Sequence, residues 1–235
     1  MGANSAFLLL VMAALSSLAV AQSGRTVRHS RVPAEDPSAS AAVTQAEAAI
    51  EKKDYTTAEQ RLNEAVGKNP NDYQAWYDLG YVLNATGHKP EAIDAYRKSV
   101  AAKADVFESN LNLGTLLASS DQPEAADFLR KATQLKPTAH PEEGLERAWL
   151  SLGHVLEKDK PQEAVVAFEK AAQLQPKDPE PLLSAGAIYE REHNLPKAEQ
   201  NFAEASKLDP KSSDAVAALV NVYTKQKKLP EAEAA

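Results

Sequence analysis

One alanine-containing motif returns along this chain at an almost constant interval. A proline stands two positions before the alanine at four of its six places, and the alanines are Ala58, Ala92, Ala125, Ala164, Ala198 and Ala232. The intervals between them are 34, 33, 39, 34 and 34 residues. A second series seven positions later, from Ala65 to Ala205, keeps the same rhythm. A fixed period of this length is typical of proteins built from stacked units, in which each unit contacts only its neighbours.

Each unit divides into two amphipathic stretches. In one unit, Trp76, Leu79 and Leu83 recur at helical spacing, and Gly87 and Pro90 then interrupt the chain before a second apolar stripe. The chain holds only 9 glycines, and it is rich in alanine, the best helix former. These features predict pairs of antiparallel helices. Small residues such as Gly80 are expected where the two helices of a pair cross, so that their axes approach closely.

The segment from Trp76 to Val100 resembles the tetratricopeptide repeat, whose signature is W-x2-L-G-x2-Y followed by A-x3-F, A and P. The resemblance covers residues 39–235 and implies an all-α, right-handed superhelix of antiparallel helix pairs. The expected units are 39–72, 73–106, 107–139, 146–178, 179–212 and a partial one at 213–235. An insertion at about 138–145 either lengthens the following helix at its start or forms a bulging loop.

The N-terminal residues predict export. Residues 6–20 contain no charge and are short for a membrane span, and Ala19 and Ala21 are small enough for a signal peptidase. We therefore expect a signal peptide at 1–21, a flexible linker at 22–38 and a periplasmic or extracellular protein with no stable membrane span after cleavage. No Lys or Arg precedes the apolar run, so an uncleaved N-terminal membrane anchor is the alternative.

The sequence contains no pattern that indicates catalysis. It lacks a phosphate-binding G-x-x-x-x-G-K-[ST], a G-x-G-x-x-G, an H-E-x-x-H and any cysteine. No catalytic, metal-binding or cofactor-binding residue is predicted, and we expect no enzyme activity and no cofactor. The 33 acidic and 26 basic side chains give a net charge of −7, which disfavours nucleic acid as a partner.

The resemblance implies that first-helix positions two, five, nine and twelve of each unit line a concave groove. The predicted peptide-binding residues at these positions are Tyr77, Tyr81, Asn84, Leu111, Thr115, Arg147, Leu150, His154 and Leu183. Tyr77 and Tyr81 are expected to be exposed and to carry most of the binding energy, because rigid aromatic side chains dominate interfaces. The alternative is that each tyrosine packs against the first helix of the next unit. The Lys and Asn that hold a terminal carboxylate in some members of the family are absent.

Three functions remain open. The chain is expected to be a non-catalytic scaffold that binds a peptide or helical segment of another protein. It could instead be the docking region of a larger exported enzyme or assembly factor, because the sequence ends within a second helix. It could also associate with itself, because the last unit is expected to expose an apolar stripe at Val216, Leu219, Val220 and Tyr223.

Overall fold

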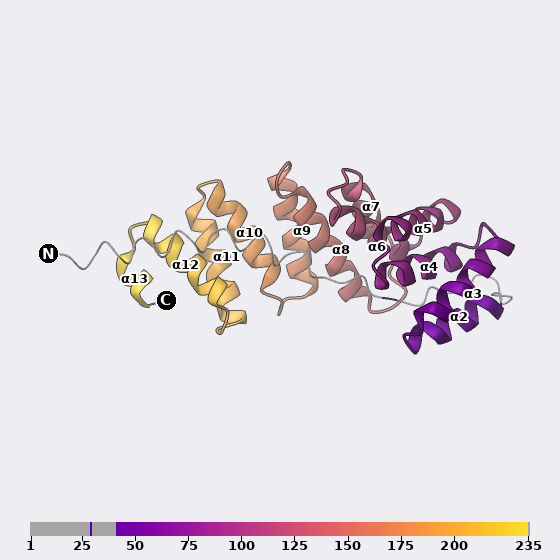
Figure 1. Cartoon of the computed structure of the whole chain (residues 1–235). Helices are drawn as coiled ribbons and strands as arrows, with labels where there is room; N and C mark the ends of the chain where they lie inside the picture. Colours follow the sequence, from indigo (N-terminus) through magenta and orange to yellow (C-terminus); the bar gives the residue numbers. More distant parts are fainter. Residues whose placement is uncertain (1–28, 30–40, 235) are drawn as a thin grey trace.

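The computed structural model describes His29 and residues 41–234, and Figure 1 shows the helices of this part stacked in chain order into an elongated array. The predicted signal peptide lies outside the described residues, as does the predicted linker apart from His29. None of the helices in the described part is both long enough and apolar enough to cross a membrane.

All regular structure in the described part is helical, and the helices follow one another as pairs. The pairs are α2 (Ala41–Glu51) with α3 (Tyr55–Lys68), α4 (Tyr73–Ala85) with α5 (Lys89–Ala102), α6 (Phe107–Ala118) with α7 (Ala125–Thr133), α8 (Pro141–Leu156) with α9 (Pro161–Leu174), α10 (Glu180–Arg191) with α11 (Leu195–Leu208), and α12 (Ser213–Lys225) with the short α13 (Leu229–Ala234). The helices of a pair pack on each other, and the second helix also packs on the first helix of the next pair. The fold is therefore an all-α superhelix, as predicted.

A glycine lies at the helix crossing in each of the four central pairs. Gly80 faces the Tyr96 ring, and Gly153 faces the Phe168 ring. A Cβ atom on Gly153 would lie 2.5 Å from Cε1 of Phe168, which is inside van der Waals contact. Gly114 and Gly186 face Leu129 and Phe202 in the same way. The absence of a side chain thus allows a bulky residue of the second helix to fill the crossing.

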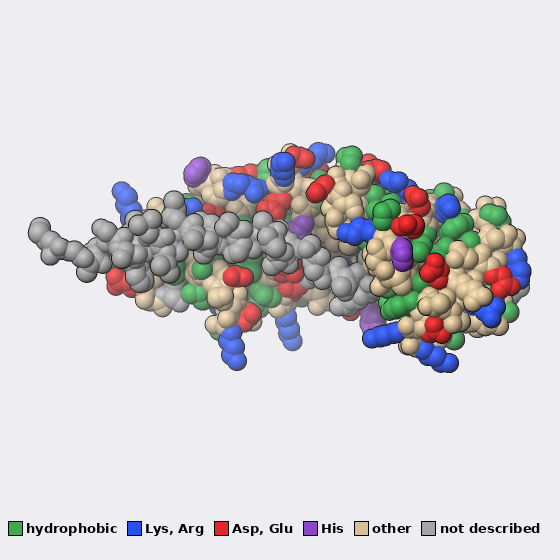
Figure 2. All heavy atoms as spheres, viewed as in Figure 1, with side chains coloured by type: hydrophobic (Ala, Val, Ile, Leu, Met, Phe, Trp, Pro, Cys, Tyr) green, Lys and Arg blue, Asp and Glu red, His purple; other side chains and the backbone are tan. Residues whose placement is uncertain are grey.

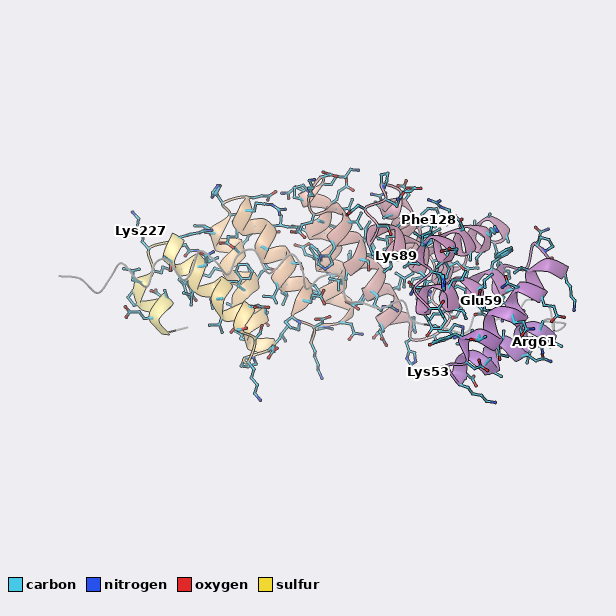
Figure 3. All side chains as sticks on the ribbon, in the orientation of Figure 1. Lys53, Glu59, Arg61, Lys89, Phe128 and Lys227 are labelled. Atoms are coloured by element: carbon cyan, nitrogen blue, oxygen red, sulfur yellow. The ribbon has the colours of Figure 1, made fainter. Side chains whose placement is uncertain are left out.

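The turns between paired helices share one backbone conformation. A residue with φ between 52° and 86° stands in every such turn except that of the fourth pair, and these residues are Lys53, Gly87, Asp121, His193 and Lys227. After each of these five residues the next amide donates to a carbonyl five residues back, as from His88 N to Leu83 O at 2.8 Å. This hydrogen bond closes the end of the first helix. Lys53 and Lys227 mark the turns near opposite ends of the array (Figure 3).

The inserted residues before the fourth pair lengthen its first helix. Helix α8 has 16 residues, whereas α6 and α10 have 12 each. It begins at Pro141, five residues before the expected unit boundary, so the helical alternative is the one adopted. A short loop precedes it, and the backbone N and Oγ1 of Thr138 donate to Glu108 Oε1 at 2.8 and 2.6 Å.

The buried side chains form three apolar clusters along the array instead of one central core. One joins the first two pairs, one joins the second and third, and the largest runs from α6 to α12. Leu219 belongs to this last cluster and is buried, so its expected exposure is wrong. Helix α13 packs on α12, and Val216, Val220 and Tyr223 are half-buried.

We predict that Gly153→Ala lowers the free energy of unfolding by about 1–3 kcal/mol, because the added methyl group collides with Phe168 inside a packed crossing. The matched control is Gly67→Ala in α3, where a Cβ atom would have no neighbour within 4 Å. The control should raise the free energy of unfolding by about 0.5–1 kcal/mol, because alanine favours helix over glycine. Urea unfolding followed by circular dichroism measures both changes, and a neutral Gly153→Ala would contradict the role of the crossing.

A candidate peptide-binding face on the first helices

The first helices of successive pairs lie beside one another along one side of the array. Helix α2 contacts α4, α6 contacts α8, and α10 contacts α12. Side chains also connect α4 to α6 and α8 to α10, through Asn112 with Tyr77 and through His154 with Glu180. We call this side the first-helix face, and all nine predicted binding residues belong to its helices.

Tyr77 does not have the exposed position that the sequence suggested. Its side chain is fully buried, with 0% exposure. Its ring lies 5.8 Å from the Tyr96 ring, and its hydroxyl oxygen accepts a hydrogen bond from Asn112 Nδ2 at 3.4 Å. Asn112 belongs to α6, so the tyrosine packs against the first helix of the next unit, which was the alternative.

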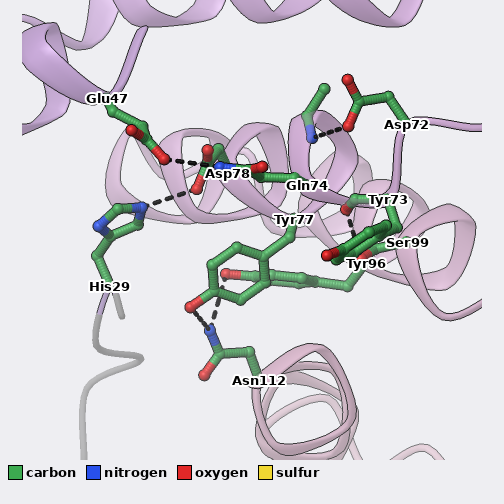
Figure 4. A network of polar contacts seen from close by, with 11 residues as sticks. His29, Glu47, Asp72, Tyr73, Gln74, Tyr77, Asp78, Tyr96, Ser99 and Asn112 are labelled. Atoms are coloured by element: carbon green, nitrogen blue, oxygen red, sulfur yellow. Dashed lines mark hydrogen bonds and ion pairs between the residues drawn. The ribbon is translucent and has the colours of Figure 1, made fainter. Parts of the chain in front are cut away.

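His29 lies against this face and completes a polar network (Figure 4). Its Nε2 is 2.8 Å from Oδ1 of Asp78, and its ring centroid is 4.8 Å from that of Tyr81. Beside it, Gln74 Nε2 donates to Glu47 Oε1 at 2.7 Å. Burial raises the pKa of the Asp78 carboxyl and outweighs the opposite effect of the hydrogen bond from His29. The network therefore places a carboxylate beneath an imidazole and two tyrosine rings.

A hollow of about 160 Å³ lies next to His29. Helix α6 supplies Leu111 and Asn112 to its wall, and α8 supplies Arg147. This space is large enough for several water molecules or for one long side chain. The structure therefore brings two predicted residues, Leu111 and Arg147, to one concave feature.

The remaining predicted residues are distributed along the same face. Leu150 is buried in the core, like Leu111, and neither side chain is an exposed contact. Tyr81, Asn84, Thr115, His154 and Leu183 are half-buried. Thr115 Oγ1 donates to the carbonyl of Leu111 in its own helix at 2.8 Å. The half-buried members are the ones that a partner can reach without a change in packing.

His154 belongs to a second charged group, separate from the His29 network. Its Nε2 is 3.4 Å from Glu180 Oε1, and its Nδ1 is 3.9 Å from Glu157 Oε2. Arg191 donates to Glu157 Oε1 at 3.3 Å. Burial, the largest single influence, lowers the pKa of His154, but the two glutamates together outweigh it and the net pKa is raised. The imidazolium is thus stabilised between α8 and α10.

Sequence reasoning did not identify His29, Asp78 or Asn112 as part of this face. His29 lies in a segment with no periodicity, and its contact with Asp78 spans 49 positions. The burial of Asp78 and Asn112 could have been predicted from the sequence. Each is a polar residue between apolar neighbours, at the sixth position of its first helix. A buried polar side chain at such a place requires a partner.

Comparison with known families identifies the repeat. A family model described as tetratricopeptide repeat matches residues 43–107, which contain α3 to α5 and most of α2. The sequence resemblance is therefore confirmed. This part of the chain carries tetratricopeptide repeats, and the helical array as a whole has the tetratricopeptide fold.

Solved structures with the same fold extend over most of the array. YrrB, described as a TPR protein with an unusual peptide-binding site, is 21% identical, with a TM-score of 0.67 over 74% of this chain and 88% of its own. MamA is 23% identical, with a TM-score of 0.64 over 71% and 95%. PilF of Pseudomonas aeruginosa is 21% identical, with a TM-score of 0.63 over 83% and 86%. Proteins of this fold class are generally non-catalytic scaffolds that bind other proteins.

The surface gives no sign of a metal centre within the part of the chain that the structure describes. No group of three or more His, Cys, Asp or Glu side chains there is arranged to hold a metal ion. On the face visible in Figure 2, Lys and Arg side chains are interspersed with Asp and Glu.

We predict that His154 makes the stability of the array depend on pH. Because its pKa is raised above the ordinary value of 6.5, its stabilising contribution is complete below pH 6.5 and is lost as pH rises through the higher folded-state value. Each unit of difference corresponds to about 1.4 kcal/mol. The free energy of unfolding, measured by urea titration from pH 5 to 9, should fall less with pH in His154→Gln than in the wild type. His88→Gln, in an exposed turn, is the control and should keep the wild-type slope; equal slopes in all three proteins would refute the assignment.

Proposed function

We propose that this chain is a non-catalytic scaffold that binds a peptide or helical segment of another protein along its first-helix face. The observation that carries the proposal is the hollow between α6 and α8, which opens beside half-buried polar side chains on a tetratricopeptide fold. Concave surfaces of helical solenoids are extended binding surfaces because small rotations between units curve the stack. YrrB, which has this fold, is described as having a peptide-binding site.

The chemistry of the face favours a segment with mixed character. Tyr81 and Leu183 offer partly exposed apolar surface, whereas Arg147 and His154 offer polar contacts. An amphipathic helix or an extended peptide presents both kinds of side chain at regular spacing. Most of the binding energy should come from a few residues near the centre of the contact.

A photo-crosslinking pair tests where the partner binds. We predict that benzoylphenylalanine at position 115, on the first helix α6, crosslinks a partner protein in an extract of the exported fraction. The same residue at position 128, in place of Phe128 on the second helix α7, is the matched control (Figure 3) and should give at most a weak crosslink. Mass spectrometry of the adduct identifies the partner. Crosslinks at position 128 alone, or of equal strength at both positions, would move the binding surface away from the first helices.

We also propose that the protein is exported and acts in the periplasm or outside the cell. The support is the uncharged run at 6–20 together with the small residues Ala19, near the end of the run, and Ala21, directly after it. Such a location restricts the partners to proteins of the same compartment.

Intact-mass measurement tests the export proposal. When the full chain is produced in a cell with a general secretion pathway, the mature protein should begin at Gln22 and should be found outside the cytoplasm. The Ala19→Arg/Ala21→Arg variant should keep its N-terminal residues, because bulky charged side chains do not fit the peptidase. A full-length wild-type product in the membrane fraction would establish the uncleaved anchor instead.

A further inference from the structure

Buried carboxylates lie on each of the first four first helices. Their exposed fractions are 6% for Glu47 in α2, 1% for Asp78 in α4, 5% for Glu108 in α6 and 3% for Glu146 in α8. No lysine or arginine among the described residues is buried. Taking a carboxylate out of water costs several kcal/mol unless opposite charge or hydrogen bonds compensate. The first-helix face of this half of the array is thus an environment that attracts positive charge.

Two of these carboxylates have an oxygen atom that lacks a hydrogen bond. Oδ2 of Asp78 and Oε2 of Glu108 are buried without a partner among the residues described. Their other oxygens are satisfied, Oδ1 of Asp78 by His29 and Oε1 of Glu108 by Thr138. Both residues are close to His29, because Asp78 contacts it and Glu108 lines the same hollow. Unsatisfied buried acceptors near one histidine indicate capacity for more donors.

His29 is held at this position by a polar contact with Asp78 and by the rings of Tyr77 and Tyr81. Its Nε2 lies 2.8 Å from Asp78 Oδ1, and its ring is stacked on Tyr77 at 6.0 Å between centroids and tilted against Tyr81 at 4.8 Å. The tyrosine rings provide apolar surface, and the carboxylate fixes the nitrogen (Figure 4). We name this arrangement of Tyr77, Asp78 and Tyr81 the imidazole site.

The sequence around His29 is positively charged, opposite in sign to the buried carboxylates of the first-helix face. Arg25, Arg28 and Arg31 surround it, and no acidic residue precedes Glu35. This segment therefore complements the four buried carboxylates in sign. His29 precedes Ala41, the first residue of α2, by twelve positions, so the histidine is tethered close to the site that it occupies. A short linker between two binding groups gives an effective concentration of about a millimolar.

We propose that the imidazole site and the adjoining hollow form a binding site for a basic, histidine-containing segment, and that His29 of this chain occupies the imidazole site. The inference rests on the proposed protein-binding function of the first-helix face and specifies its ligand. A partner with a similar segment must displace His29 before it binds. Competition with His29 consequently lowers the apparent affinity of the site for other ligands. Only ligands that outcompete the tethered histidine occupy the site.

A peptide supplied in solution tests this proposal. The probe is a fluorescent synthetic peptide RTVRHSRVP, which has the sequence of residues 25–33. The proteins are the full chain, His29→Ala and His29→Ala/Asp78→Asn, and the readout is fluorescence anisotropy. His29→Ala should bind the probe at least about tenfold more tightly than the wild type, because the tethered competitor is removed. The double variant should lose this gain, because a charged acceptor is replaced by a neutral one.

Two controls separate this site from general charge attraction and from misfolding. The peptide RTVRASRVP keeps the arginines but lacks the imidazole, and it should bind His29→Ala at least about tenfold more weakly than the probe. Circular dichroism and thermal melting verify each fold, and Glu108→Gln replaces Asp78→Asn in the double variant if Asp78→Asn unfolds. Equal probe affinity of wild type and His29→Ala, or of the two peptides, would overturn the proposal. A crosslink at position 115 together with such a result would leave the broader scaffold function intact.

Discussion

The close crossing of two helices at a glycine is the contact on which this array depends. At Gly153 the ring of Phe168 occupies space that any Cβ atom would need, and the same relation recurs at three other crossings. Each crossing fixes the distance and angle within a pair. Because the four central pairs share that close crossing, they stack in the same way and their first helices meet on one side. The candidate binding face is thus a consequence of a contact in the interior of each unit.

The electrostatics of the face follow from that arrangement. First helices that approach one another bury the polar side chains at their sixth positions, among them Asp78 and Asn112. Burial then makes each polar atom dependent on a specific partner, since water no longer solvates it. Asn112 obtains its partners from the hydroxyl groups of Tyr77 and Tyr96, and Asp78 obtains one from His29. The interior of the stack therefore determines which groups can be recognised at its surface.

The fold could be predicted from the sequence because every repeat unit specifies the same local structure, a pair of helices. Alanine, glycine and proline at fixed intervals define helix pairs without any knowledge of long-range contacts, and the computed structure has those pairs. The burial of Tyr77 could not be predicted in the same way, because the exposed fraction of its side chain depends on how closely helix α6 packs against it. The position of His29 could not be predicted for a related reason. Its contact with Asp78 joins a segment without periodicity to a residue 49 positions later in the chain.

The division of the apolar interior into three clusters has a consequence for how the molecule opens. No single nucleus holds the ends together, so the N-terminal pair, whose cluster extends no further than α5, can separate while the helices from α6 to α12, which share one cluster, remain folded. Heat or urea should then melt the chain from its N-terminal pair inward, and one midpoint temperature would describe the average of several partial events. The pair that bears the imidazole site, α4 with α5, is the second from this end, where such fraying is easiest.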